Sequence, residues 1–299
     1  MKTVYKILFA TVLLGTVSCK EEFLQTEPTE LISANQIQEA SALNPGLQSA
    51  NVAGIYATMY GAGTGGTSGH DDFGHKSYDM YGDMLSGDMA LTSVIYGWFR
   101  TITEFQTTVD YTQADNYQVW RFYYRLIFAA NTVIDGLGGS EAIPATASGR
   151  WFMGQAKAMR AFSYFYLAQY FQNEYNPSEK ILPLYKNTKD PNLPKSTAAD
   201  VYALMVKDLT DAQSLLSDFS RTNKSEVNAS VAKGMLAYVH GAMGNNAAMK
   251  TVTADVISTG GFKIMTAAEA TGGFNALATS QWMWGVDITV DSKLNLISW

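Results

Sequence analysis

Apolar residues recur every three or four positions along most of this chain, which is the period of a helix with one buried face. Strict alternation of apolar and polar residues, the mark of a half-buried strand, is rare. The pattern predicts helices over 117–137 and 149–171, and over parts of 37–60, where an Asn-Pro-Gly turn at 44–46 interrupts it. Because the segment 149–171 is apolar on nearly all sides, we expect that helix to be buried between its neighbours.

Later helices begin at recognisable capping residues. Thr197 and Asp200 have the spacing of a capping box, with Asp in place of Glu or Gln, and Asn228 precedes a further helix. A Gly-Asn-Asn turn at 244–246 then leads into an antiparallel partner over 247–258. Two helices joined by a short turn form a helical hairpin, which roughly fits the ~34-residue period of tetratricopeptide repeats. The predicted fold class is therefore mainly α, with tetratricopeptide-like hairpins in an α-solenoid-like arrangement, long loops and minor β-structure.

Two segments depart from the helical pattern. Residues 61–100 contain nine glycines, so we predict a long loop that faces a ligand or an interface, with a short helix inside it. Residues 286–290 alternate and predict a strand. The chain then stops in an apolar run at Trp299, which is unusual because chain termini are mostly exposed. We therefore expect this sequence to be a fragment of a longer protein.

The amino terminus has the pattern of a secretory signal. Two lysines precede an apolar run at 7–17 that is too short to cross a hydrocarbon layer of ~30 Å as a helix. Cys19 follows directly and resembles the cysteine of a bacterial lipobox, which is acylated and becomes the first mature residue, although Thr16 stands where Leu is usual. The charged tripeptide at 20–22 resembles the surface-export signal of some Gram-negative lipoproteins. The alternative is a soluble secreted protein with a cysteine at its cleavage site by chance.

Composition excludes several classes of protein. The 299 residues are 47% hydrophobic, which is enough for a large core. They carry 21 basic against 27 acidic side chains, a net charge of −6, whereas a nucleic-acid binder is normally basic. The single cysteine excludes a disulfide framework and a cysteine-based zinc site. Aromatic residues make up 12%, and the most frequent is Tyr, whose ring and polar tip suit a binding surface.

Short motifs follow one another in a fixed order along nearly the whole chain. They are Cys19 to Leu24 with Pro28, Trp120 to Ile127 with Ala130 and Asn131, Gly154 to Phe165, Leu182-Pro183-Leu184, Lys195 to Thr197 with Val201, Tyr202 and Asp208, and finally Asn228 to Gly244. Together these motifs resemble the SusD/RagB family of outer-membrane nutrient-binding lipoproteins, whose members are usually much longer than this chain.

The resemblance implies a domain division and a function. Residues 1–18 would be a lipoprotein signal peptide, and 19–299 a SusD-like amino-terminal helical-repeat domain that lacks the family's carboxyl-terminal region. The protein would be a surface-facing outer-membrane lipoprotein, anchored through Cys19, that binds a glycan or other nutrient. It would deliver this ligand to a TonB-dependent transporter of the SusC type. Such a protein breaks no bond, so the resemblance implies no catalytic residue and no cofactor. We also expect no nucleic-acid partner.

A sugar site needs flat aromatic faces for the apolar C–H patches of the sugar and polar side chains for its hydroxyls. The segment 61–100 supplies both, and the predicted ligand-binding residues are Tyr96, Trp98, Arg100, Tyr81, Asp83, Asp72, Phe73 and His70. Tyr96 and Trp98 are the leading pair, because alternate positions in an extended segment would place both rings on one side. The same spacing applies more weakly to Tyr81 and Asp83. For each residue the alternative is a core ring or a solvated carboxylate.

Other assignments stay open at the level of sequence. A surface glycoside hydrolase would use two carboxylates, and several pairs are available among Asp71, Asp72, Asp79, Asp83, Asp88 and Glu104. A structural or adhesion lipoprotein would bind no ligand at all. The His and Asp residues at 70–75 could be read as a metal cluster and 287–291 as a calcium loop. However, a glycine-rich loop holds ligands poorly, and the second segment lacks the glycine and the closing Glu of a calcium loop, so we predict no metal site.

Overall fold

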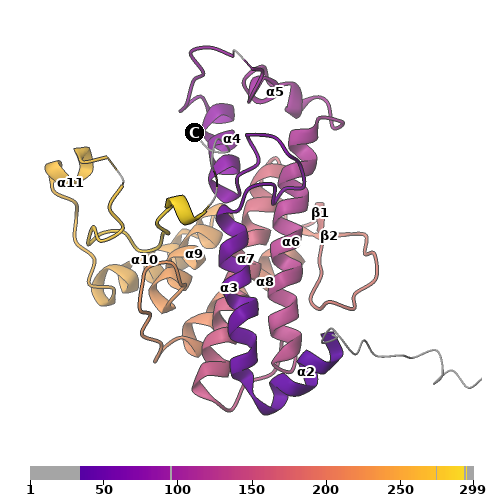
Figure 1. Cartoon of the computed structure of the whole chain (residues 1–299), viewed down its shortest axis with the longest axis vertical. Coiled ribbons are helices and arrows are strands. Elements are labelled where there is room, and N and C mark those ends of the chain that lie inside the picture. Colours follow the sequence, from indigo (N-terminus) through magenta and orange to yellow (C-terminus); the bar gives the residue numbers. More distant parts are fainter. Residues whose placement is uncertain (1–33, 95, 274, 293, 295–299) are drawn as a thin grey trace, which may run out of the picture.

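The computed structural model describes residues 34–94, 96–273, 275–292 and 294 (Figure 1). The signal peptide expected at 1–18 and the expected lipid-bearing Cys19 lie outside the described residues. The longer elements are α2 (Ala34–Leu43), α3 (Ser49–Tyr60), α4 (His75–Ser86), α6 (Ala114–Gly136), α7 (Ala147–Phe171), α8 (Ala198–Leu215), α9 (Ala229–Ala242) and α10 (Asn246–Thr259). Shorter ones are η2 (Pro45–Gln48), α5 (Arg100–Thr103), η3 (Gln106–Thr108), α11 (Ala267–Thr271) and η4 (Val290–Ser292).

The structure confirms the predicted helix break at 44–46 and the predicted capping residues Thr197 and Asn228. The interruption at 44–46 separates α2 from α3, with the Asn44 side chain accepting a hydrogen bond from the backbone N–H of Gly46. Thr197 caps α8 by accepting from the N–H of Asp200, and Asn228 caps α9 by accepting from the N–H of Val231. These side chains satisfy backbone donors that a helix start leaves without partners.

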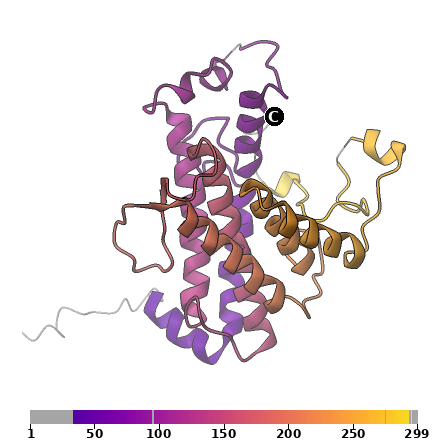
Figure 2. The same ribbon diagram turned by 180° about the vertical axis from the view of Figure 1, so that it is seen from behind.

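Consecutive helices pack mainly on one another, α6 on α7, α7 on α8, α8 on α9 and α9 on α10. Both views show α3, α6 and α7 side by side, α9 and α10 leading away to one side, and α4 with α5 at one end of the bundle (Figures 1 and 2). Such nearest-neighbour stacking is how helical repeats build a continuous core. The predicted mainly α architecture of helical hairpins is thus confirmed.

Minor β-structure is confined to one place in the described residues. Strand β1 (Lys180–Pro183) pairs antiparallel with β2 (Lys195–Thr197), with Leu182 opposite Ser196. The connection between the two strands runs beside α6 (Figure 1). This short hairpin matters below because its connection forms one wall of a groove.

The strand predicted over 286–290 is wrong. The segment has no ladder partner in the described chain, and its end curls into η4, where the N–H of Thr289 donates to the Ser292 hydroxyl at 3.1 Å. Val286, Ile288 and Val290 are all exposed. Alternation alone cannot stabilise a strand, because a strand needs neighbours to satisfy its backbone groups. No helix in the described ranges is long and apolar enough to cross a membrane.

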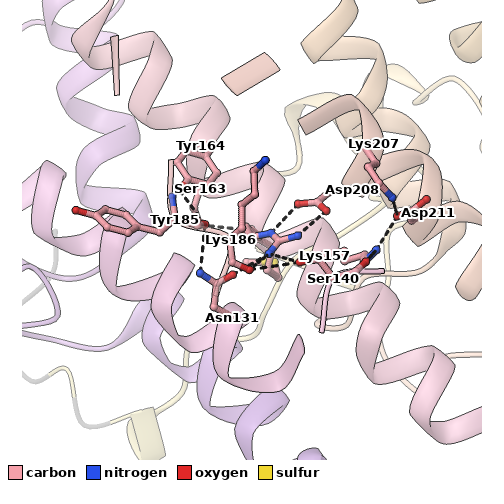
Figure 3. A network of polar contacts seen from close by, with 12 residues as sticks. Asn131, Ser140, Lys157, Ser163, Tyr164, Tyr185, Lys186, Lys207, Asp208 and Asp211 are labelled. Atoms are coloured by element: carbon pink, nitrogen blue, oxygen red, sulfur yellow. Dashed lines mark hydrogen bonds and ion pairs between the residues drawn. The ribbon is translucent and has the colours of Figure 1, made fainter. Parts of the chain in front are cut away.

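A charged network lies inside the buried helix α7. Arg160 is 0% exposed, and its guanidinium donates to both carboxylate oxygens of Asp208 on α8, at 2.7 and 2.8 Å. The third guanidinium nitrogen, Nη1, donates to Asn131 Oδ1 at 2.8 Å and to the backbone oxygen of Lys186 at 3.0 Å. Figure 3 shows these partners converging from separate elements. A buried ion pair is tolerated only when its hydrogen bonds are satisfied, so this network fixes how α6, α7, α8 and the chain after β1 meet.

Candidate functional site

Asp72 organises the loop between α3 and α4. Its carboxylate accepts hydrogen bonds from the N–H of Gly65 at 2.8 Å, from the N–H and hydroxyl of Thr67 at 2.9 and 3.0 Å, and from the Tyr78 hydroxyl at 3.0 Å. The residue is completely buried. Several donors are what a buried carboxylate requires. Asp72 therefore shapes the loop and does not face a ligand, contrary to its prediction as a binding residue.

The loop lies flush against the helices beneath it. At Gly66, where φ is +94°, an added Cβ would lie 2.2 Å from Nη1 of Arg121 on α6. At Gly74, where φ is +83°, it would lie 2.3 Å from the backbone oxygen of Met59. Glycine suits the left-handed backbone at both positions, and at Gly74 a side chain would also meet the backbone of α3. The glycine-rich composition at these positions therefore serves packing, and it holds the loop to α3 and α6.

Two aromatic rings stack face to face at this end of the molecule. The rings of His70 and Trp98 are stacked with centroids 4.8 Å apart and an interplanar angle of 6°. His70 comes before α4 and Trp98 comes after it, so the helix and its flanking loops bring the two rings together. His70 is exposed, and Trp98 is 38% exposed. We call the pair His70–Trp98 the ring platform.

The chain around Trp98 is a turn and not an extended segment. Gly97 has φ +85° and Phe99 has φ +61°, and the N–H of Arg100 donates to the backbone oxygen of Gly97 at 3.2 Å. The Phe99 ring packs edge-on against Tyr81 at 5.8 Å. A left-handed conformation is costly for a side chain such as Phe, so it persists only where packing imposes it. The premise that Tyr96 and Trp98 occupy alternate positions of an extended segment is therefore wrong.

The remaining predicted residues divide into exposed and buried groups. Tyr96 is 83% exposed, and Arg100 is exposed beside Glu104, with 3.9 Å between Nε and Oε1. Tyr81 and Phe73 are buried in the core, so their prediction as ligand contacts is corrected. Asp83 is half-buried on α4. Since residues 81 and 83 are helical, two positions separate their side chains by about 200°, and the shared-side argument for them fails as well.

The buried Tyr81 hydroxyl joins a small polar cluster beneath the loop. It lies 3.3 Å from Asp71, 3.5 Å from Asp115 and 3.1 Å from the Gln118 side-chain oxygen. Burial raises the pKa of Asp71 above its usual range, and the negative charge of Asp115 adds to this. Both carboxylates are less than a tenth exposed. A glycosidase needs its two carboxyl groups open to the sugar, whereas Asp71 and Asp115 expose little of their surface.

No group of three or more His, Cys, Asp or Glu side chains that could hold a metal ion occurs among the residues described in the structure. His70 is engaged by Trp98, and Nδ1 of His75 lies 2.9 Å from the Tyr123 hydroxyl. A cavity of about 790 Å³ lies between α3, the start of α4, α7, α9 and residues 283–288. Its walls are mainly apolar, with Met59, Phe162 and Trp284 among them. Such walls offer few partners for sugar hydroxyls.

Comparison with known families and structures defines the class of protein. A family model described as starch-binding associating with outer membrane, and named SusD-like, matches residues 66–240, which run from the loop before α4 into α9. The chain belongs to this SusD-like family. The match covers both members of the ring platform and the Arg160 network.

Solved structures of SusD-like proteins have the same helical fold. A SusD-like carbohydrate binding protein from Bacteroides vulgatus ATCC 8482 is 25% identical with a TM-score of 0.74, and the alignment covers 83% of this chain and 51% of that one. A SusD superfamily protein from Bacteroides thetaiotaomicron VPI-5482 is 21% identical with a TM-score of 0.65, over 88% of this chain and 54% of that one. A laminarin binding SusD-like protein is 21% identical with a TM-score of 0.55, over 72% and 45%.

This chain therefore spans about half the length of the solved structures that it resembles. The comparison with curated proteins finds no match.

Proposed function

We propose that this chain is the glycan-binding part of a cell-surface lipoprotein that passes its ligand to a SusC-type TonB-dependent transporter without breaking a bond. The observation that supports it most is the ring platform, an exposed pair of stacked rings with His70 on the braced loop before α4 and Trp98 after it. Stacked rings can cover the apolar face of a sugar ring, while Arg100 and Glu104 close by in the chain can bond its hydroxyls. Membership of the SusD-like family supports the same function.

The experiment measures binding of neutral oligosaccharides by isothermal titration. Laminarin fragments and xylogluco-oligosaccharide are suitable first probes, since one solved relative is a laminarin binding SusD-like protein and another was crystallised with xylogluco-oligosaccharide. Trp98→Ala removes half of the platform. Loss of a stacked ring is worth on the order of 1 kcal/mol beyond its area, so the dissociation constant should rise about five-fold or more.

Tyr111→Ala is the matched control, because Tyr111 is 91% exposed and makes no ring contact with the described chain. This variant should bind as the parent does. Unchanged affinity in Trp98→Ala, with a folded protein, would refute the platform. The same samples are assayed for reducing ends, and new ends released from the probe would overturn the non-catalytic role and favour the surface hydrolase.

The transporter partnership is tested by capture from outer membranes. The full-length protein, affinity-tagged, should bring a large β-barrel protein with it. Recovery of the protein without any transporter, while it still binds glycan, would contradict delivery and leave binding intact. Absence of both glycan and transporter would favour a structural or adhesion lipoprotein.

A further inference from the structure

A second concave surface lies between α6 and the connection from β1 to β2. Its volume is about 350 Å³, which is within the range of small-ligand sites. None of its lining residues belongs to the loop segment 61–100, so it is separate from the ring platform. We call it the α6 groove.

One wall of the α6 groove is a row of aromatic side chains. Trp120, Tyr124 and Phe128 line the groove and follow one another at intervals of four residues on α6. This spacing places them on one side of the helix in steps of about 6 Å. The rings of Trp120 and Tyr124 have centroids 4.8 Å apart, and Phe128 is 59% exposed at the end of the row.

The opposite wall is polar and comes from the β1–β2 connection. Asn187, Thr188, Asp190 and Asn192 line the groove there. Asp190 is the one charged side chain among the groove's lining residues. Its carboxylate accepts from the N–H of Lys186 at 2.7 Å and from the side-chain amide of Asn187 at 2.7 Å, and carboxylate oxygens have lone pairs left for further donors. The exposed Asn192 amide makes no hydrogen bond within the described chain.

The buried network behind the α6 groove holds the two walls in place. Arg160 donates to the backbone oxygen of Lys186, and Asn131 of α6 donates to the backbone oxygen of Tyr185 at 3.2 Å. The Tyr164 hydroxyl accepts from the N–H of Tyr185 at 2.7 Å (Figure 3). On the outer side, the Asp135 carboxylate accepts from the N–H and the hydroxyl of Thr188, both at 2.7 Å. The groove is therefore formed before any ligand arrives, which lowers the entropic cost of binding.

We infer that the α6 groove is a second saccharide-binding site that takes a short neutral oligosaccharide. The row of rings would cover the C–H faces of successive sugar units, while the amides and Asp190 would bond hydroxyls along the other edge. An anionic sugar fits poorly because Asp190 would repel it. An apolar segment of protein fits poorly as well, because it would leave the polar wall without partners. The inference rests on the proposed function, since it extends glycan binding to a second place on the same chain.

The test uses titration of the whole protein with the same laminarin fragments and xylogluco-oligosaccharide. Phe128→Ala removes an exposed ring from the groove, and Asn192→Ala removes an exposed amide, so neither change disturbs the core. Both are made in the wild-type and Trp98→Ala backgrounds, with Tyr111→Ala as the control. Binding that survives Trp98→Ala should weaken at least five-fold, about 1 kcal/mol, when Phe128→Ala is added. Asn192→Ala should weaken it less.

The outcomes separate the two sites. Equal affinity with and without Phe128→Ala in both backgrounds would overturn the α6 groove and leave the ring platform standing. If Phe128→Ala loses binding while Trp98→Ala binds as tightly as the wild type, the result would support the α6 groove and refute the ring platform. Binding of anionic sugars or peptides at the groove in place of neutral oligosaccharides would overturn the inference, and so would a wild-type protein that binds no saccharide.

Discussion

His75 at the start of α4 should make the protein less stable as the pH falls. Its imidazole packs against the rings of Tyr166 and Phe162, with centroids 4.6 and 4.9 Å away, and Nδ1 lies 2.9 Å from the Tyr123 hydroxyl. Burial among these rings lowers the pKa of His75 from 6.5 to about 4, with the charge of Asp79 opposing and that of Lys76 adding to the effect. Burial disfavours the charged imidazolium because few groups replace its water.

The sign and size of the effect follow from this difference in pKa. In the unfolded chain His75 takes up a proton near pH 6.5, whereas in the folded chain it does so only near pH 4. The contribution of neutral, buried His75 to the free energy of unfolding is therefore fully present above pH 6.5. It is lost as the pH falls to about 4. At about 1.4 kcal/mol per pKa unit, the loss reaches at most about 3.5 kcal/mol. The residue keeps partial exposure, which makes this figure an upper bound.

The assay is urea unfolding between pH 4 and 7.5 for the wild type, His75→Gln and Tyr123→Phe. The free energy of unfolding of the wild type, minus that of His75→Gln, should fall as the pH is lowered from 7.5 to 4. Tyr123→Phe removes the hydroxyl partner and keeps the imidazole buried, so its pH dependence should stay close to that of the wild type. Parallel curves for the wild type and His75→Gln would refute the reasoning.

Two further predictions concern the core and the anchor. Asp208→Asn leaves the buried Arg160 guanidinium without its counter-charge and should lower the free energy of unfolding by about 3–5 kcal/mol, measured by urea unfolding. Glu141→Gln breaks an exposed pair with Lys207 and should change it by less than about 1 kcal/mol, and equal effects would contradict the assigned burial. Cys19→Ala should release the protein from membranes in cell fractionation, because the proposed acyl chains would hold it at ~0.8 kcal/mol per buried methylene. Continued membrane association would show that a partner holds it instead.

The sequence predicted those features of the fold that depend on near neighbours in the chain. The helical period located α6 and α7, and single side chains such as Thr197 and Asn228 located helix starts. The wrong strand over 286–290 shows the converse, since alternation carries no information on whether a neighbouring strand exists.

The site was less predictable because its contacts join residues far apart in the chain. His70 and Trp98 were both candidates, but their stacking depends on how α4 and its flanking loops fold back. Tyr81 carries the same side chain as Tyr96, and only tertiary packing makes the first a core residue and the second exposed. The α6 groove was missed altogether. Its signal was the four-residue spacing of Trp120, Tyr124 and Phe128, which lies beside the apolar face that defined the helix.

The most direct test of the account is a crystal structure of the protein with its tightest-binding neutral oligosaccharide. The account predicts a sugar ring lying parallel to the stacked rings of His70 and Trp98, with its hydroxyls reaching the neighbouring polar side chains. An oligosaccharide bound elsewhere, with the ring platform bare, would contradict the central claim.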